Sequence, residues 1–366
     1  MRARLFISAF VRRIAPEGLV PRRTKDVSRM TAEMEAVRLH ETGGPQSLRL
    51  DRIPTPAAGD GEVLVRLRAA ALNHRDVFIT QGLYPNIRMP VTPGSDGAGE
   101  IEAIGAGTFE GAVGDEVVID PLLGWGDDPR VWDTATANIL GMPRDGTFAR
   151  YVAVPSANVY RKPEHLSMEE AAAIPLAGLT AYRAIFTRAA LARGETVLIT
   201  GVGGGVQTFV LLFAKHAGAR AIVTSSSDEK LERATALGAD LAINYKTTPE
   251  WAKIVRAAGP VDLVVDSSGG ETLGKALDVV RPGGRIAIYG GTNGDATIKL
   301  FPLFWKHVTI LGTSMGSPHD FAAMLELFRK GLSPVVDRVF PLQNTAAAMQ
   351  HLASAEQFGK VVLRID

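Results

Sequence analysis

The stretch from Glu195 to Lys230 reads ETVLITGVGGGVQTFVLLFAKHAGARAIVTSSSDEK. A short β-branched run is followed by a glycine cluster, an apolar run with helical spacing and a second apolar run, which predicts a strand, a turn, a helix and a strand. Glycines at such a turn let the backbone approach a pyrophosphate, and the helix N-terminus presents free N–H groups to it. We therefore predict a dinucleotide-binding turn whose contacts are Gly201, Gly203, Gly204, Gly205 and Val206.

The glycine pattern departs from the usual spacing, because Val206 or Gln207 stands where a third glycine is expected, depending on which glycines are counted. Glycine-rich turns also occur in α/β proteins that bind nothing there. The chain after Lys230 strengthens the dinucleotide interpretation. Predicted helices at 229–237, 251–257 and 273–280 alternate with predicted strands at 241–244, 261–266 and 285–289. This alternation is typical of a doubly wound parallel sheet.

Ligands on such sheets bind at the carboxyl ends of the strands, near the point where the strand order reverses. Small residues at these ends leave room for a long ligand, although any one of them is also ordinary loop composition. The candidates beyond the first turn are Ser225, Ser226, Ser267, Gly290 and Gly291.

The end of the second strand indicates which dinucleotide binds. An Asp or Glu there would bind the ribose 2′-hydroxyl of NAD and repel a 2′-phosphate. This strand ends in Thr224 and three serines, with no acid before Asp228 and with Lys230 nearby. These residues favour NADP(H). The competing interpretation, which is compatible with phosphate binding, is a helix-capping box formed by Ser226 and Glu229.

Length and composition fit an ordinary two-domain protein of 366 residues with 46% hydrophobic residues and a formal net charge of +1. These values exclude a disordered chain and do not predict nucleic-acid binding. No apolar run reaches the ~18 residues of a membrane span. The chain has no cysteine, which excludes disulfides and thiolate metal sites and fits a reducing compartment; we expect a cytoplasmic protein.

Residues 1–33 differ from the rest, since they hold eight Lys/Arg against three acids and so carry a net charge of +5. Three interpretations compete: an Arg-rich peptide targeting an organelle, a basic tail, or an early start codon with Met30 or Met34 as the true start. We expect a disordered, dispensable extension.

From Met34 onward, short strands with Gly/Pro turns predict a barrel-like β domain. The predicted strands include 35–39, 48–50, 62–68, 114–119 and 148–154. Residues 121–146 have no period and are expected to form a surface excursion. Residues 308–312 form an apolar run after the α/β section, and residues 320–329 form an amphipathic helix. Strands at 335–340 and 360–365 are expected to return to the β domain.

Six segments in this order resemble the medium-chain dehydrogenase/reductase superfamily, and specifically its zinc-free, quinone-oxidoreductase-like branch. They are Ala71-Leu-Asn-His-Arg-Asp76, Gln81-Gly-Leu-Tyr-Pro85, Pro93-Gly-Ser-Asp-Gly-Ala-Gly99, Val113-Gly-Asp-Glu-Val117, Gly178-Leu-Thr-Ala-Tyr182 and Gly359-Lys-Val-Val-Leu363. The resemblance runs from about Glu35 to the C-terminus. It implies a GroES-like β-barrel catalytic domain at 34–157 and 306–366, a Rossmann domain at 158–305, an active site in the cleft between them, and a homodimer or homotetramer.

Zinc enzymes of this superfamily carry a Cys, a His and a Cys where this chain has Asn73, Ser95 and, nearby, Leu176. None of these three replacements holds a catalytic Zn²⁺. The cysteines of the structural zinc lobe are missing as well, and the seven histidines show no ligand spacing. We therefore expect no metal, and a reaction other than alcohol oxidation, which needs a stabilised alkoxide. Gln207 replaces the usual small residue of the turn, so tight helix packing there is uncertain.

The resemblance also implies residue roles. Asn73 and Thr180 line the nicotinamide; Ser226, Lys230 and Tyr245 hold the 2′-phosphate; and Tyr84 matches a proton-donating tyrosine of related enoyl-thioester reductases. Alternatives stay open: Tyr84 as an aromatic that packs the cleft wall and Thr180 as a helix cap. Arg75 and Asp76 are expected to be a buried pair, and His74 a structural residue with its hydrogen bonds satisfied.

The predicted function is zinc-independent delivery of hydride from NADPH to a small electrophile, namely a quinone or another α,β-unsaturated carbonyl. Two alternatives remain. A 2-enoyl thioester reductase would need a basic rim, which the scattered Arg and Lys residues do not show. The other is a non-catalytic NADPH-binding protein.

Overall fold

The structure is a computed structural model that describes residues 32–107 and 109–366. The predicted extension at 1–33 therefore lies almost wholly outside the described residues. Residues from Glu33 to Asp366 form one unit, which contains two large sheets. Among the described residues, no helix has both the length and the apolar composition needed to span a bilayer.

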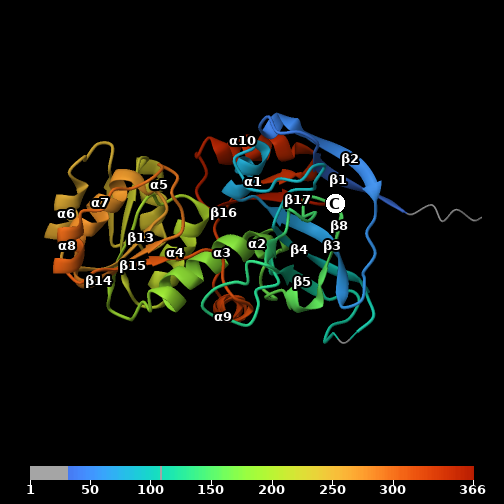
Figure 1. Ribbon diagram of the computed structural model, residues 1–366, viewed down its shortest axis with the longest axis horizontal. Helices are drawn as coiled ribbons and strands as arrows, with labels where there is room; N and C mark the ends of the chain where they lie inside the picture. Colours follow the sequence, from blue (N-terminus) through green and yellow to red (C-terminus); the bar gives the residue numbers. More distant parts are fainter. Residues whose placement is uncertain (1–31, 108) are drawn as a thin grey trace, which may run out of the picture. The chain divides into compact units, whose positions relative to one another are not determined.

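The predicted parallel sheet is confirmed, and its six strands pair in the order β12-β11-β10-β13-β14-β15 (Figure 1). The chain first builds outward from β10 to β12 and then crosses to the other side of β10, so the order reverses between β10 and β13. The strands are β10 (Thr196–Ile199), β11 (Arg220–Ser225), β12 (Leu241–Asn244), β13 (Val261–Asp266), β14 (Val280–Ile288) and β15 (Thr309–Gly312). Because β15 belongs to this sheet, the predicted domain boundary at residue 305 falls too early.

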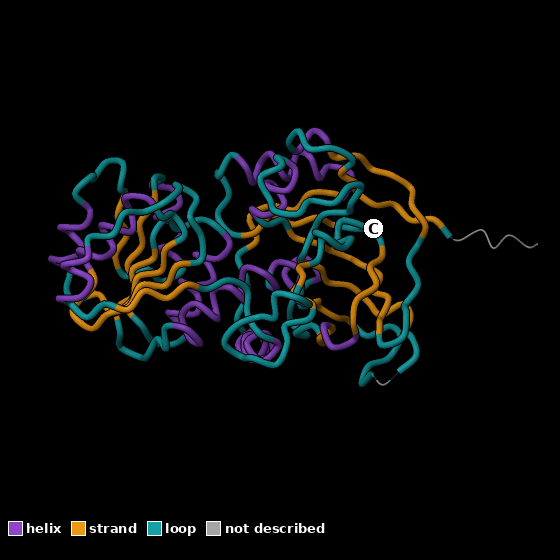
Figure 2. The backbone as a smooth tube through the Cα atoms, in the orientation of Figure 1, coloured by secondary structure: helices purple, strands orange, loops and turns teal. Residues whose placement is uncertain are grey.

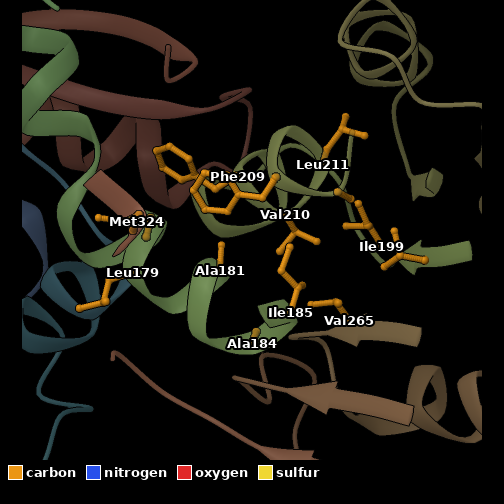
Figure 3. Packing of buried hydrophobic residues seen from close by; sticks show 14 of the residues in the cluster. Leu179, Ala181, Ala184, Ile185, Ile199, Phe209, Val210, Leu211, Val265 and Met324 are labelled. Carbon is orange, nitrogen blue, oxygen red and sulfur yellow. The ribbon is translucent and has the colours of Figure 1, made fainter. Parts of the chain in front are cut away.

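Both faces of this sheet are buried, which explains why its strands are continuous apolar runs. Val197 and Ile199 face one core together with Phe209, whereas Leu198 between them faces a second core with Leu273. Figure 3 shows the first core, in which Ile199 and Val265 of the sheet lie near Val210. The helices of this part are α4 (Gly205–His216), α5 (Asp228–Ala236), α6 (Trp251–Ala257), α7 (Gly270–Val279) and α8 (Leu300–Trp305).

The second sheet has seven strands, which follow the order β16-β17-β3-β4-β5-β9 with β8 added at β3. Figure 2 draws the strands of both sheets in orange. They are β3 (Glu62–Ala71), β4 (Asp96–Ile104), β5 (Glu116–Ile119), β8 (Tyr151–Pro155), β9 (Val159–Arg161), β16 (Val336–Pro341) and β17 (Lys360–Arg364). The last strand, β17, pairs antiparallel with β3. The predicted return of the C-terminal strands to the β domain is therefore confirmed.

Smaller elements complete the described chain. They are the hairpin β1 (Glu33–Leu39) and β2 (Leu48–Pro54), the pair β6 (Leu122–Leu123) and β7 (Asn138–Ile139), and the helices α1 (His74–Thr80), α2 (Met168–Ala173), α3 (Pro175–Tyr182), α9 (Pro318–Arg329) and α10 (Thr345–Ala353). A π-helix, η3 (Arg183–Arg188), continues α3, and short 3-10 turns are η1 (Pro45–Ser47), η2 (Ser156–Asn158) and η4 (Leu342–Asn344).

The expectation that residues 121–146 form a surface excursion is wrong in part. Leu122, Trp125 and Leu140 are buried, and Trp125 belongs to the core that also contains Ile199. The segment lacks a period because its apolar residues anchor separate turns rather than one face of a helix or strand.

Candidate functional site

The glycine turn lies where the strand order reverses, so β10 and β13 deliver their loops to the same place. Gly201 and Gly203 have φ angles of +69° and +132°, which residues other than glycine rarely adopt. Asp266, at the end of β13, accepts hydrogen bonds from the Thr200 hydroxyl (2.5 Å) and from the Gly269 N–H (2.8 Å). One buried carboxylate thereby holds the two loops in register.

Two lysines cross this turn. A Cβ added at Gly203 would lie 2.8 Å from Cδ of Lys230, and one added at Gly205 would lie 2.8 Å from Cδ of Lys360. The glycines are thus required for the lysine stems to lie against the backbone. The Lys230 ammonium, whose Nζ would lie 3.2 Å from the same Cβ at Gly203, suits the phosphates of a dinucleotide together with the free helical N–H groups.

The other predicted cofactor residues also lie at strand ends. Ser225 is paired with Asn244 across β11 and β12, and the Tyr245 N–H donates to the Ser225 carbonyl at 3.0 Å. Ser267 follows β13, and its hydroxyl accepts from the Gln207 amide at 2.7 Å. Gln207 therefore ties the first turn of α4 to the next loop instead of loosening it. Gly290 and Gly291 follow β14, and a Cβ at Gly290 would lie 3.1 Å from the Ser267 carbonyl oxygen.

The structure changes the predicted capping box. The N-cap of α5 is Ser227, whose hydroxyl accepts from the Lys230 N–H at 3.3 Å, so the Ser226–Glu229 capping box is wrong. Ser226 therefore does not cap α5. The Lys230 ammonium donates to the Ala355 carbonyl at 2.6 Å, and burial lowers the pKa of this lysine. The 2′-phosphate site at Ser226, Lys230 and Tyr245 stays a prediction.

A buried cluster of polar side chains adjoins the glycine turn. The Lys360 ammonium donates to Asn73 Oδ1 at 2.7 Å and to Asp96 Oδ2 at 2.9 Å, and all three residues are buried. The Asn73 amide donates to the same Asp96 oxygen at 3.0 Å. We call Asn73, Asp96 and Lys360 the ammonium cluster.

Sequence reasoning found Asn73 but gave no role to Asp96 or Lys360. The signal in the sequence was the lysine itself: it comes directly before an apolar run, Val361, Val362 and Leu363, which is fully buried. A lysine is almost never fully buried without a partner.

The three positions at which zinc enzymes of the resembled superfamily hold their metal do not form a zinc site here. Asn73 already accepts from an ammonium group, and the Ser95 hydroxyl accepts from Arg75 at 2.7 Å and donates to the Leu140 carbonyl at 2.9 Å. Leu176 contributes only its backbone N–H, which donates to Asp96 at 2.8 Å. Thiolate, imidazole and carboxylate ligands are what Zn²⁺ requires, and two cations lie at these positions instead. Across residues 32–107 and 109–366, no group of three or more His, Asp or Glu side chains is placed to hold a metal ion.

Thr180 is connected to the ammonium cluster through Leu176. It lies inside α3, and its buried hydroxyl donates to the Leu176 carbonyl at 2.8 Å. The alternative that Thr180 caps a helix is therefore wrong. The structure brings Asn73 and Thr180 into one hydrogen-bonded chain that runs through Asp96 and Leu176.

Tyr84 contacts Arg75 rather than the ammonium cluster. The Arg75 guanidinium lies 4.8 Å from the centre of the tyrosine ring, and its Nε donates a long hydrogen bond of 3.4 Å to the hydroxyl. The ring also packs on a small core that contains Ile79 and Val91. These contacts fit the packing alternative, and the proton-donor role of Tyr84 stays a prediction.

The predictions for the other residues of the Ala71–Asp76 motif have different outcomes. Arg75 and Asp76 are a buried pair, as predicted, with 3.8 Å between Arg75 Nη1 and Asp76 Oδ1. Burial raises the pKa of Asp76 to about 6. The expectation that His74 is a structural residue with satisfied hydrogen bonds is wrong. His74 is exposed, and its side chain makes no hydrogen bond within the described chain.

Two family models match the chain: the zinc-binding dehydrogenase model at residues 205–330 and the alcohol dehydrogenase GroES-like domain model at residues 59–164. A zinc-type alcohol dehydrogenase-like protein of Schizosaccharomyces pombe is 39% identical over 340 residues, which cover 89% of this chain and 97% of that protein. An NAD-dependent alcohol dehydrogenase of Sulfurisphaera tokodaii is 31% identical over 357 residues, which cover 90% of this chain and 99% of that protein. Among solved structures, an NAD-dependent alcohol dehydrogenase has a TM-score of 0.86 and 40% identity, covering 91% of this chain and 100% of that one.

Proposed function

This chain belongs to the medium-chain dehydrogenase/reductase superfamily of oxidoreductases, and from that premise we propose that it transfers hydride from NADPH to a quinone or another α,β-unsaturated carbonyl without zinc. The observation that supports this proposal is the ammonium cluster. A buried ammonium group, paired with Asp96, donates to Asn73, which stands where zinc enzymes of this superfamily have a cysteine ligand.

NADPH, when bound, supplies the hydride. The turn from Gly201 to Val206 would hold its pyrophosphate, with Ser267, Gly290 and Gly291 beside it. Ser225, Ser226, Lys230 and Tyr245 would hold the phosphorylated ribose, and Asn73 and Thr180 the nicotinamide. Names of relatives specify NAD, so NADH is the alternative that any assay must include.

The chain's own contribution is electrostatic. An ammonium group has three N–H donors, and Lys360 directs two of them at Asn73 and Asp96. The third is available to an oxygen that becomes negative as a conjugated carbonyl accepts electrons. A preorganised donor in a site that excludes water stabilises such an oxygen strongly. Asn73 and Asp96 keep the ammonium in place, so no reorganisation is needed as charge develops.

The test is NADPH oxidation by the purified protein with benzoquinone, cyclohexenone and crotonyl-CoA, before and after treatment with a zinc chelator. We expect turnover of the quinone or the enone that the chelator leaves unchanged, and weaker turnover with NADH. Exclusive turnover of crotonyl-CoA would instead establish a 2-enoyl thioester reductase. Binding of NADPH without turnover of any acceptor would establish a non-catalytic protein. Loss of activity with the chelator and its recovery with Zn²⁺ would refute the proposal.

The expected homodimer or homotetramer is also kept as a proposal. Four large apolar side chains of α8 are 59–69% exposed, and β15 ends the parallel sheet with one edge that no strand of the described residues pairs with. Exposed edges and apolar patches of this kind are interaction surfaces. Light scattering should show a multimer that Phe301→Ser with Trp305→Ser dissociates; a monomeric native chain would contradict this.

A further inference from the structure

A pocket of about 570 Å³ is lined by none of the residues assigned above to the cofactor or the reaction. Its walls come from the segment 125–132, the π-helix η3 and the residues that follow β15. The residues that matter for the argument are Trp125, Arg130, Trp132, Arg183, Arg188 and Thr313. The volume lies in the range of small-molecule sites.

Two of the three arginines in the pocket are already neutralised. Arg183 is buried and pairs with Asp320 at 2.6 Å, and it also donates to the Arg130 carbonyl at 2.6 Å, which anchors the loop. Arg130 pairs with Asp128 at 2.8 Å and is 83% exposed.

Arg188 differs, because it has no ion pair or hydrogen bond within the described residues. Its Nε atom is buried and has no hydrogen-bond partner there, and the same holds for the hydroxyl of Thr313, which also lines the pocket. A buried polar group without a partner destabilises the fold. Two residues that line the pocket, Arg188 and Thr313, therefore each have a buried donor without an acceptor among the described residues.

The π-helix explains how Arg188 comes to line this pocket. Its hydrogen bonds join residues five positions apart, so Arg183 and Arg188 lie on the same side. In an α-helix, residues five apart point in different directions. Wide turns of this kind occur frequently at functional sites.

The other wall is aromatic. Trp125 and Trp132 meet edge to face, with their centres 6.4 Å apart and an angle of 70° between their planes. The indole N–H of Trp125 donates to the Asp128 carbonyl at 2.8 Å, which fixes that ring. Rigid aromatic walls bind flat apolar groups, and the water that they exclude strengthens nearby charge interactions.

We propose that this pocket binds a small organic anion in which a carboxylate is attached to a flat apolar ring. The carboxylate accepts from the Arg188 guanidinium and the Thr313 hydroxyl, and the ring lies against Trp132 and Trp125. The planar guanidinium matches a carboxylate in two parallel hydrogen bonds, which gives the site its preference for this group.

The probe is benzoate, and the readout is tryptophan fluorescence, because two of the chain's four tryptophans line the pocket. Benzyl alcohol keeps the ring without the charge, and acetate keeps the charge without the ring. We expect saturable quenching by benzoate that neither control reproduces, and weaker binding at high salt. Equal binding of benzyl alcohol, or no saturable binding of benzoate up to ~10 mM, where a site of this size would be occupied, would overturn the proposal.

Variants then locate the site. Arg188→Gln should lower benzoate affinity about tenfold, the value of one charge-assisted hydrogen-bond pair. Arg130→Gln is the matched control, since that arginine lines the same pocket but already has a partner, and it should change affinity less than about threefold. Unchanged affinity in Arg188→Gln would refute the assignment. If that variant does not fold, Arg188→Lys, which keeps the charge but loses the fork, should still weaken binding, and undiminished affinity there would refute it too.

Discussion

The glycine turn and the ammonium cluster are adjacent, yet they are built in opposite ways. The turn is one contiguous stretch whose backbone is proposed to bind the pyrophosphate, and its glycines carry no side chain, so that lysine stems pass close by. The cluster takes one side chain from each of three distant segments, at positions 73, 96 and 360, and its charges determine what it does. The comparison teaches that small residues shape a site locally, whereas a buried charge depends on the fold that supplies its partner.

The largest effect is expected where the charge balance of the cluster is broken. In Lys360→Met, Asp96 stays buried without its counter-ion, so the free energy of unfolding should fall by about 3 kcal/mol. NADPH oxidation should fall at least about 100-fold, because the oxygen that gains charge loses its donor. Denaturant unfolding and steady-state rates measure the two.

A double variant separates these effects. Lys360→Met with Asp96→Asn removes the unpaired charge, so stability should largely recover while turnover does not. Recovery of both would mean that Lys360 only stabilises the fold.

Asp120, directly after β5, is a second buried carboxylate to compare with Asp96, because it has no cationic partner among the described residues. Burial raises the pKa of Asp120 to about 8 in the folded protein. Between about pH 4, the unfolded value, and pH 8 the folded state holds the extra proton, so stability is highest at low pH and falls as pH rises, by about 1 kcal/mol per unit.

Asp120→Asn, which retains an acceptor for the Leu122 N–H, should therefore be increasingly more stable than the native chain from pH 5 to pH 8. Unfolding at four pH values measures this. Asp128→Asn is the control: Arg130 lowers the pKa of Asp128 to about 2, below this window, so its difference should stay constant. A constant difference for Asp120→Asn would contradict the raised pKa.

The glycine turn should respond to bulk rather than to charge. Gly203→Ala places a Cβ 2.8 Å from the Lys230 stem at a φ of +132°, which should weaken NADPH binding about tenfold through strain of 1–3 kcal/mol. Titration of NADPH fluorescence measures the affinity. Gly274→Ala in α7 is matched, because its Cβ would meet nothing within 4 Å, and it should leave the affinity unchanged. Similar affinities for all three proteins would rule out this turn as the pyrophosphate site.

The smallest effect is expected for Tyr84→Phe. The ring keeps its place under Arg75 and loses only a hydroxyl with a hydrogen bond of 3.4 Å, so kcat should change less than about threefold. A fall of about 100-fold would instead identify Tyr84 as the proton donor. Steady-state kinetics, with the acceptor that the NADPH-oxidation assay identifies, decide between the two.

The sequence predicted what depends on local pattern. The sequence was sufficient to predict the glycine turn, the alternation of strands and helices and the return of the last strand, because turn chemistry and apolar runs act over a few residues. Where the prediction was wrong, neighbours in space decided. Ser227 rather than Ser226 caps α5, β15 joins the parallel sheet, and Trp125 is drawn from a patternless loop into the core.

The cluster was found only in part for the same reason. Asn73 lies in a contiguous motif, but Asp96 and Lys360 acquire their roles only when β17 pairs with β3 and places the lysine beside the amide. Arg188 shows the same limit, since no local pattern indicated that η3 would be a π-helix.

The pairing of β17 with β3 also sets an order of events during synthesis. Asn73 and Lys360 are 287 residues apart, and Gly359 donates to the Gly203 carbonyl at 2.9 Å. A nascent chain can therefore complete the whole parallel sheet before the Lys360 ammonium is present to pair with Asp96. Until β17 leaves the ribosome, residues 69–71 of β3 lack the partner strand that β17 supplies and Asp96 lacks its counter-ion, so the ammonium cluster can form only after the strands of the parallel sheet have been made.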